Sequence, residues 1–196
     1  MNNLYKRNSV PLNEAGDTLV NRLCTYMILK DGVDIDLRGI QSNRSYGNQA
    51  LVQQVVQNIE SGNYAKYLDN ATSAEGQIAN DFFEEFRRNH SDKYRYVQEM
   101  VDDIKYEAPS LGQTNFGLQS LSLLVYLIMS ETMDGASIRS LISAFELAAE
   151  NPESCPELMR EIQRHCTFTT MDSTSSVKIL ELYKNCYSDP LMDTEV

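Results

Sequence analysis

Five side chains are candidates for acid–base chemistry, because they are neighbouring carboxylates or a histidine. They are Glu84, Glu85, Asp102, Asp103 and His90. Neighbouring acidic residues on a helix usually belong to a solvated face, and a histidine at a helix junction, such as His90, is usually exposed. No glycine-rich phosphate loop and no His-Glu-x-x-His motif accompanies them. We therefore expect a protein that is not an enzyme. The alternative is an enzyme whose active site has no recognisable motif and uses His90 or carboxylates with shifted pKa values.

The four cysteines are too scattered to suggest a metal site. No two of them form a Cys-x-x-Cys pair, and His165-Cys166 is the one adjacent pair of metal-ligand types. Zinc needs four ligands, mostly at close paired spacings. We therefore expect no metal or other cofactor, and free thiols in a reducing compartment. The first residues lead into no apolar signal segment, so the expected location is cytoplasmic.

The composition is that of a folded protein and argues against one broad class of partner. The chain has 196 residues, of which 42% are hydrophobic and 23% charged, as in an ordinary single domain. The formal net charge is −11. Proteins that bind phosphate backbones use clustered Lys and Arg, and the only adjacent arginines, Arg87 and Arg88, are expected on a solvated helix edge. We expect no nucleic-acid partner.

The segment from Thr114 to Met129 is expected to form the centre of the fold. From Leu121 onward it is apolar on nearly every side, and only Ser122 and Tyr126 interrupt the pattern. A helix without a polar face must be surrounded by other elements or by lipid. About 18 apolar residues are needed to cross a bilayer, and this run is shorter. The sequence therefore predicts a buried central helix and no membrane-spanning segment.

Seven amphipathic stretches accompany this central helix, each with apolar residues at three- and four-residue steps. They contain residues 19–27, 51–59, 78–86, 94–104, 138–148, 158–162 and 177–183. Residues 33–47 are expected to form a loop, and residues 167–176 a joint for which a short strand is the weaker alternative. The prediction is an all-α, single-domain bundle of about eight helices over residues 1–187, with a flexible tail at 188–196.

Three of these stretches together resemble the Bcl-2 family of apoptosis regulators. The segment from Leu19 to Gly32, with a mid-helix Tyr and a closing Gly, resembles the family's fourth homology region. Thr114-Asn115-Phe116-Gly117 is similar to the Asn-Trp-Gly-Arg that opens the buried helix of the first region. Ile179 to Tyr183 resembles the end of the second region. The resemblance implies a Bcl-2-like bundle with a hydrophobic groove that accepts an amphipathic partner helix through contacts at i, i+3, i+4 and i+7.

Several positions depart from the family's pattern. Phe116 stands where Trp is usual, and Leu118 stands where the family's arginine pairs with an aspartate of the ligand. The chain contains no Trp, and it lacks the family's hydrophobic C-terminal anchor. Two stretches compete for the third region: residues 52–59 have its apolar spacing, whereas residues 12–19 have its Leu-x-x-x-Gly-Asp but in the wrong order. We therefore expect weak or altered specificity for the usual helical ligands.

The predicted groove collects apolar side chains of two helices together with the start of the central helix. Its candidate residues are Phe82, Phe86, Val97, Met100, Val101, Asn115, Phe116 and Gly117. The first functional hypothesis is therefore a non-enzymatic regulator that binds partner helices in this groove, with apoptosis as the regulated process that the resemblance implies. Whether it promotes or restrains cell death, and in which oligomeric state, is left open.

The end of the chain carries a separate motif. Thr194-Glu195-Val196 has the form Thr-x-Val with a free carboxylate. PDZ domains bind such ends by strand addition while backbone amides capture the carboxylate. The alternative function is therefore a helical adaptor that recruits PDZ-type domains through this tail.

Overall fold

The computed structural model describes residues 11–32, 36–42, 47–172 and 175–187, and within these ranges it contains helices and no strand. The elements in chain order are α2 (Pro11–Lys30), α3 (Arg38–Ser42), α4 (Gln49–Glu60), α5 (Ala65–Asp69), α6 (Ala74–Arg88), α7 (Ser91–Glu107), the 3-10 helix η1 (Pro109–Gly112), α8 (Asn115–Ser130), α9 (Gly135–Glu150), α10 (Pro156–Arg164) and α11 (Ser175–Tyr187). The predicted all-α class is confirmed. The additional elements are short: α3 lies inside the stretch expected to be a loop, and five residues are too few to show a helical period.

The contacts divide the chain into two compact units, Asn21–Val97 and Gln98–Val196 together with Met1–Val20. Helices α2 and α7 each contribute residues to both units. Each unit is described by itself below. The prediction of a single domain stays a prediction.

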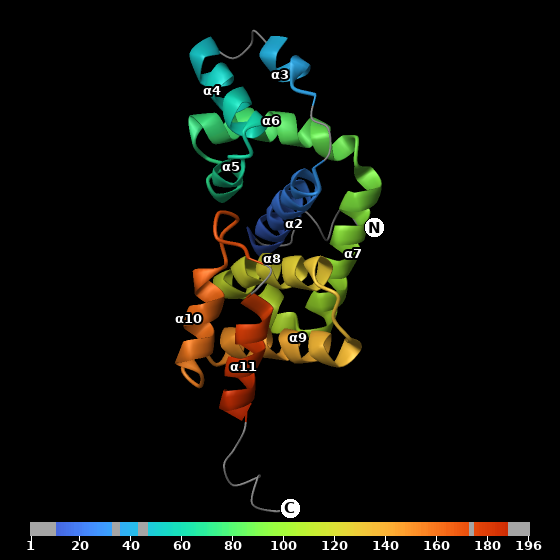
Figure 1. Cartoon of the computed structure of the whole chain (residues 1–196), viewed down its shortest axis with the longest axis vertical. Helices are drawn as coiled ribbons and strands as arrows, with labels where there is room; N and C mark the ends of the chain where they lie inside the picture. The colour runs from blue at the N-terminus through green and yellow to red at the C-terminus, as the bar shows by residue number, and fades with distance from the viewer. Residues whose placement is uncertain (1–10, 33–35, 43–46, 173–174, 188–196) are drawn as a thin grey trace, which may run out of the picture. The chain divides into compact units, whose positions relative to one another are not determined.

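In the Asn21–Val97 unit, α4 packs against α3 and α6, and α5 packs against α6 (Figure 1). The apolar face of α4 is buried, as its spacing predicts, and Gly62, with a φ of +86°, follows the end of the helix. Helix α6 begins with a side-chain cap, because Ser73 Oγ accepts a hydrogen bond of 2.9 Å from the Gly76 N–H. Gly76 is needed there, since a Cβ atom would collide with the carbonyl oxygen of Asn70.

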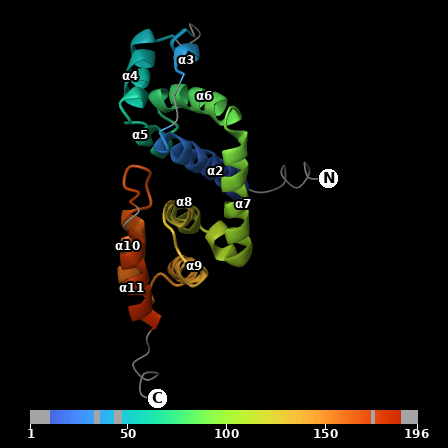
Figure 2. The same cartoon turned by 45° about the vertical axis from the view of Figure 1, so that its right-hand side comes forward.

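In the Gln98–Val196 unit, α8 packs against α9 and η1, and α9 also contacts α10 and α11. Figure 1 shows α10 beside α11 and α11 crossing α9, and in Figure 2 α9 is seen almost end-on beside α11. Helix α8 is the predicted buried helix, since every residue from Leu121 to Leu127 is buried. Its hydroxyls are satisfied within the helix: Ser120 donates to the Gly117 carbonyl at 3.1 Å and Ser122 to the Gln119 carbonyl at 2.8 Å.

Helix α9 begins before the amphipathic stretch 138–148 that the sequence indicates. It begins at Gly135, because the carboxylate of Asp134 accepts a hydrogen bond of 2.7 Å from the Ser137 N–H and so serves as its N-cap. These backbone and side-chain hydrogen bonds from Ser137 lower the pKa of Asp134. An acidic cap also complements the helix dipole.

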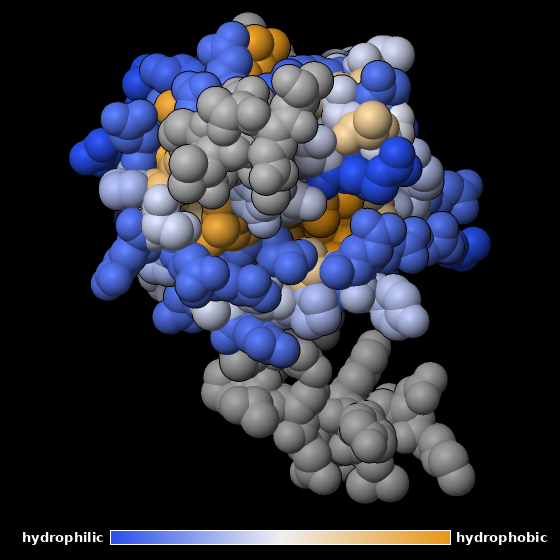
Figure 3. Space-filling view, turned by 90° about the horizontal axis from the view of Figure 1, so that it is seen from below, coloured by the Kyte–Doolittle hydropathy of each residue, from blue (hydrophilic) through white to orange (hydrophobic). Residues whose placement is uncertain are grey.

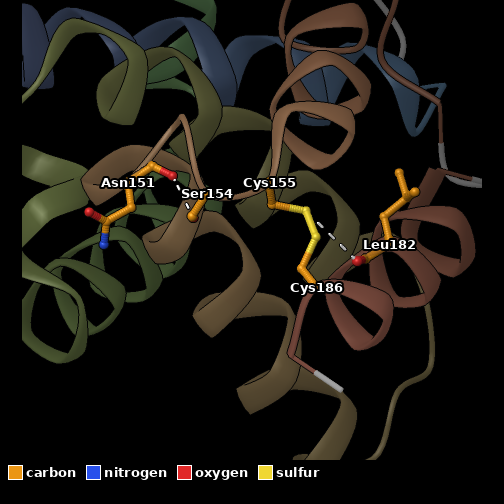
Figure 4. The surroundings of a disulfide bond; sticks show 5 residues. All are labelled: Asn151, Ser154, Cys155, Leu182 and Cys186. Atoms are coloured by element: carbon orange, nitrogen blue, oxygen red, sulfur yellow. Dashed lines mark hydrogen bonds between the residues drawn. A yellow bond between two sulfur atoms is a disulfide. The ribbon is translucent and has the colours of Figure 1, made fainter. Parts of the chain in front are cut away.

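The prediction that all four cysteines are free thiols is wrong for two of them. Cys155 and Cys186 form a disulfide, whereas Cys24 and Cys166 are free (Figure 4). The Cα atoms of Cys155 and Cys186 lie 6.0 Å apart, although 31 positions separate them in the chain. The bond joins the residue before α10 to the last turn of α11. The spacing of the cysteines in the sequence does not predict this pairing, because it results from the packing of α11 on α10.

Candidate functional site

A groove on the surface of the Gln98–Val196 unit lies between α9 and α11. It has a volume of about 420 Å³. Its lining residues are Ala136, Ser137 and Ser140 from α9, and Val177, Leu180, Glu181, Tyr183 and Lys184 from α11. Most of the surface that lines the groove is apolar, and α11 contributes one acidic and one basic residue to it.

The groove follows from the different sizes of the side chains on its two walls. The α9 wall is made of Ala and Ser, whose short side chains leave space beside the helix. On α11 the lining residues include positions 177, 180, 181 and 184, which follow the i, i+3, i+4, i+7 spacing of one helix face. Ile179, on another face, is fully buried, and Val177 is 63% exposed. Helix α11 therefore packs through one face and leaves an apolar stripe of Val177, Leu180 and Tyr183, which are partly or fully exposed, with Glu181 and Lys184 beside it.

The first half of α11 is held by polar contacts as well as by Ile179. Ser176 Oγ donates a hydrogen bond of 2.5 Å to a carboxylate oxygen of Glu131, which caps the end of α8. Lys178 Nζ lies 3.6 Å from the carboxylate of Glu161 on α10, and that carboxylate is nearly buried. After Ile179 no residue of α11 is buried, up to its end at Tyr187. The disulfide at Cys186 is thus the covalent attachment of the second half.

The eight residues predicted to line a groove lie in different environments. Five of them are buried: Phe82, Phe86, Val97, Val101 and Gly117. Met100 and Phe116 are partly exposed, and Asn115 is exposed. A partner helix would reach the five buried positions only after a rearrangement, so their part in binding stays a prediction. None of the eight lines the groove between α9 and α11, which the sequence reasoning missed.

Two of the predicted positions are explained by packing within their unit. A Cβ atom on Gly117 would come within 2.9 Å of the Leu111 backbone, so glycine lets the start of α8 approach η1. Leu118, which stands where the resembled family has an arginine, is buried. An apolar, buried side chain supplies no charge to a ligand at this position.

The side chains considered for acid–base or metal chemistry are engaged in structural contacts or exposed. Both carboxylate pairs lie on exposed faces, as predicted. His90 donates from Nδ1 to the Phe86 carbonyl at 2.8 Å, and its ring is tilted by 43° against the Phe86 ring, with 4.5 Å between the ring centroids. His165 Nε2 lies 3.2 Å from Glu161, and Cys166 donates to the Ile162 carbonyl at 2.9 Å. Among the described residues no three such side chains gather as metal ligands.

The expectation of a solvated edge at the two adjacent arginines is correct for Arg88 only. Arg88 is exposed, whereas Arg87 is half-buried and donates to Thr25 Oγ1 at 3.1 Å. Burial lowers the pKa of Arg87. Arg87 thus links α6 to α2 inside the Asn21–Val97 unit and is not part of a basic surface.

The surface of the described residues carries few large exposed apolar side chains. They are Tyr96, Tyr106, Val177 and Tyr187, and the last two belong to α11. Figure 3 shows one face of the chain, on which small hydrophobic areas lie between mostly hydrophilic residues. No described helix is both long and apolar enough to cross a membrane.

The C-terminal motif Thr194, Glu195 and Val196 lies outside the described residues. Comparison with known proteins gives no relative: no family model, no curated protein and no solved structure matches the chain.

Proposed function

We propose that the protein is a non-enzymatic regulator that binds a basic, amphipathic partner helix in the groove between α9 and α11. The observation that carries the proposal is the exposed apolar stripe of α11 beside the short side chains of α9. The resemblance to Bcl-2 proteins, whose work is to bind such helices, supports regulation of apoptosis as the process and the cytoplasm as the location.

The dimensions of the groove set the kind of ligand. From Val177 to Lys184 the helix rises about 10 Å at 1.5 Å per residue, which is two turns. Two apolar side chains of the partner helix, at positions i and i+3 or i and i+4, fill this length. The lining carries both Glu181 and Lys184, so the preference for a basic partner helix comes from the net charge of −11, because opposite charge steers association.

The test is isothermal titration of the purified chain with a designed peptide that carries two Leu anchors at i and i+4 and Lys on the other face. The peptide is about 20 residues long, because shorter helices are marginal in water. We expect saturable binding that Val177→Glu abolishes. Tyr106→Glu is the matched control, since Tyr106 is 88% exposed on α7 and this substitution changes the net charge equally.

Two further variants separate the alternatives. Met100→Glu probes the groove predicted from the sequence; if it abolishes binding while Val177→Glu does not, the partner helix binds at the predicted position. If the peptide binds in the groove predicted from the sequence, adding an Asp to it should not raise its affinity, because the buried Leu118 supplies no positive charge there. Absence of binding to every peptide would refute the proposed function.

The second candidate is the adaptor function of the C-terminal Thr194-Glu195-Val196. Deleting residues 193–196 should remove binding to PDZ domains and leave binding of the helical peptide unchanged. Loss of peptide binding on this deletion would instead place the tail in the helix-binding site.

A further inference from the structure

The disulfide between Cys155 and Cys186 lies at the end of the helix that forms one wall of the proposed groove. Helix α11 contributes five of the lining residues, and the last of them, Lys184, precedes Cys186 by two positions. Any change in the position of the second half of α11 therefore changes the groove.

We propose that this disulfide is a reversible redox clamp that holds the second half of α11 in place and so keeps the groove competent to bind its helix. This inference rests on the proposed function for its consequence, but the clamp itself is a property of α11. Oxidation holds the groove in its binding form, and reduction releases the wall.

The distribution of buried residues along α11 supports the clamp. Ser175, Ser176 and Ile179 are buried, and contacts with Glu131 and Glu161 hold the same half of the helix. Between Leu180 and Tyr187 every residue is partly or fully exposed. Segments with few buried apolar contacts open locally at low free-energy cost. Without the covalent bond this half of α11 depends on Leu180, Leu182 and Tyr183, none of which is fully buried, and on the hydrogen bond of Tyr183 with Ser143 of α9.

The two sulfur atoms are placed for reductive cleavage from one side. Cys186 is an exposed residue, whereas Cys155 is only 3% exposed. Accessible disulfides are the labile and regulatory ones, and those of cytoplasmic proteins are usually transient. A reducing thiol is therefore expected to attack at Cys186.

The reaction balances with a low-molecular-weight thiol of the glutathione class. Its thiolate attacks Sγ of Cys186, the S–S bond breaks, and Sγ of Cys155 leaves as a thiolate that takes a proton. A second thiol attacks the resulting mixed disulfide and releases Cys186 as a thiol. The protein disulfide gains two electrons and two protons, and the two reductant thiols become one disulfide. The reverse reaction with that disulfide re-forms the clamp.

A weaker contact remains after reduction. Sγ of Cys155 lies 4.0 Å from the carbonyl oxygen of Leu182 on α11 (Figure 4). A thiol can donate to this oxygen, whereas a disulfide sulfur has no proton to donate. In the reduced protein one long sulfur hydrogen bond replaces the covalent bond. The second half of α11 is therefore expected to detach and return repeatedly.

The first measurement is hydrogen exchange of the full chain in its oxidised form and after reduction with a phosphine. We expect reduction to lower the protection of the backbone amides in residues 180–187 and to leave α8 unchanged. The double variant Cys155→Ser/Cys186→Ser should show the amide protection of the reduced protein, whether or not the reductant is present. Cys166→Ser, which keeps the disulfide, is the matched control and should respond as the original chain does. Equal protection of residues 180–187 in both redox states would overturn the clamp.

The second measurement is titration with the designed helical peptide in both redox states. If the groove of the reduced protein is in its binding form about one tenth of the time, the affinity for the peptide falls about tenfold. Equal peptide affinities in the oxidised and reduced states would overturn the proposal that the disulfide regulates binding. If no peptide binds in either state while reduction still exposes residues 180–187, the proposed function fails and the clamp stands.

Discussion

Gly117 at the start of α8 lies so close to Leu111 of η1 that a Cβ atom on Gly117 would come within 2.9 Å of the Leu111 Cα atom and carbonyl oxygen. Contacts this short involve backbone atoms, which cannot move aside as the end of a flexible side chain can. The glycine therefore lets the central helix begin against η1, and Thr114 fixes the same turn by accepting a hydrogen bond of 2.9 Å from the Gly117 N–H.

The first prediction concerns this contact. Gly117→Ala should lower the free energy of unfolding by about 1–3 kcal/mol, because the added methyl group overpacks a site bounded by backbone. Urea unfolding followed by circular dichroism measures the change. Gly135→Ala is the control: its Cβ atom would meet only the Arg139 guanidinium at 3.5 Å, and alanine favours the helix, so no loss is expected. Equal losses in the two variants would contradict the role given to Leu111.

Reduction of the Cys155–Cys186 bond should destabilise the folded chain. The disulfide closes a loop over a sequence separation of 31, and restricting the unfolded chain in this way contributes about 3–4 kcal/mol. Urea unfolding with and without a phosphine reductant measures the difference. The double variant Cys155→Ser/Cys186→Ser should be insensitive to the reductant; sensitivity in that variant would show that the reductant acts elsewhere.

The two free thiols should be inert in the folded protein. Burial raises the pKa of both Cys24 and Cys166 to about 12. Since the thiolate is the nucleophile, iodoacetamide at pH 8 should label neither residue until the chain unfolds. The raised pKa contributes stability below the ordinary thiol value of 9.0, and this contribution is lost as the pH rises from there toward 12. Cys24 is buried and Cys166 is partly exposed. Intact-mass analysis without reductant should find no adduct on the native chain and two on the denatured chain; adducts on the native chain would contradict the raised pKa of these thiols.

The cap of α9 should weaken in acid. Hydrogen bonds from Ser137 lower the pKa of Asp134 below its ordinary value of 3.8. The stability from this group is therefore complete above pH 3.8 and is lost as the pH falls through the lower, folded-state value. Asp134→Asn keeps a capping oxygen without the titration.

Unfolding of the original chain and of Asp134→Asn between pH 6 and pH 2 isolates the effect, because the other carboxylates titrate in both proteins. The original chain should lose more stability than the variant as the pH falls. Parallel loss in the two proteins would rule out a titrating cap at Asp134.

The sequence by itself determined the elements whose signals are local. Apolar periodicity gave the longer helices, Ser73 marked the start of α6, and Gly32 and Gly62 followed the ends of α2 and α4. The apolar run from Leu121 to Leu127 determined a buried helix, since no arrangement of a helix without a polar face leaves it in water. Carboxylate pairs on exposed helix faces followed from the same periodicity.

Only the tertiary structure decided which apolar face stays open and which cysteines meet. Val177 and Ile179 are both apolar and two residues apart, yet one is 63% exposed and the other is buried, because α11 packs on α9 and α10 through one face. The pairing of Cys155 with Cys186 depends on the same packing, which brings positions far apart in the chain within reach. Such contacts are set by which helices lie together, and a periodic pattern within one helix carries no information about its neighbours.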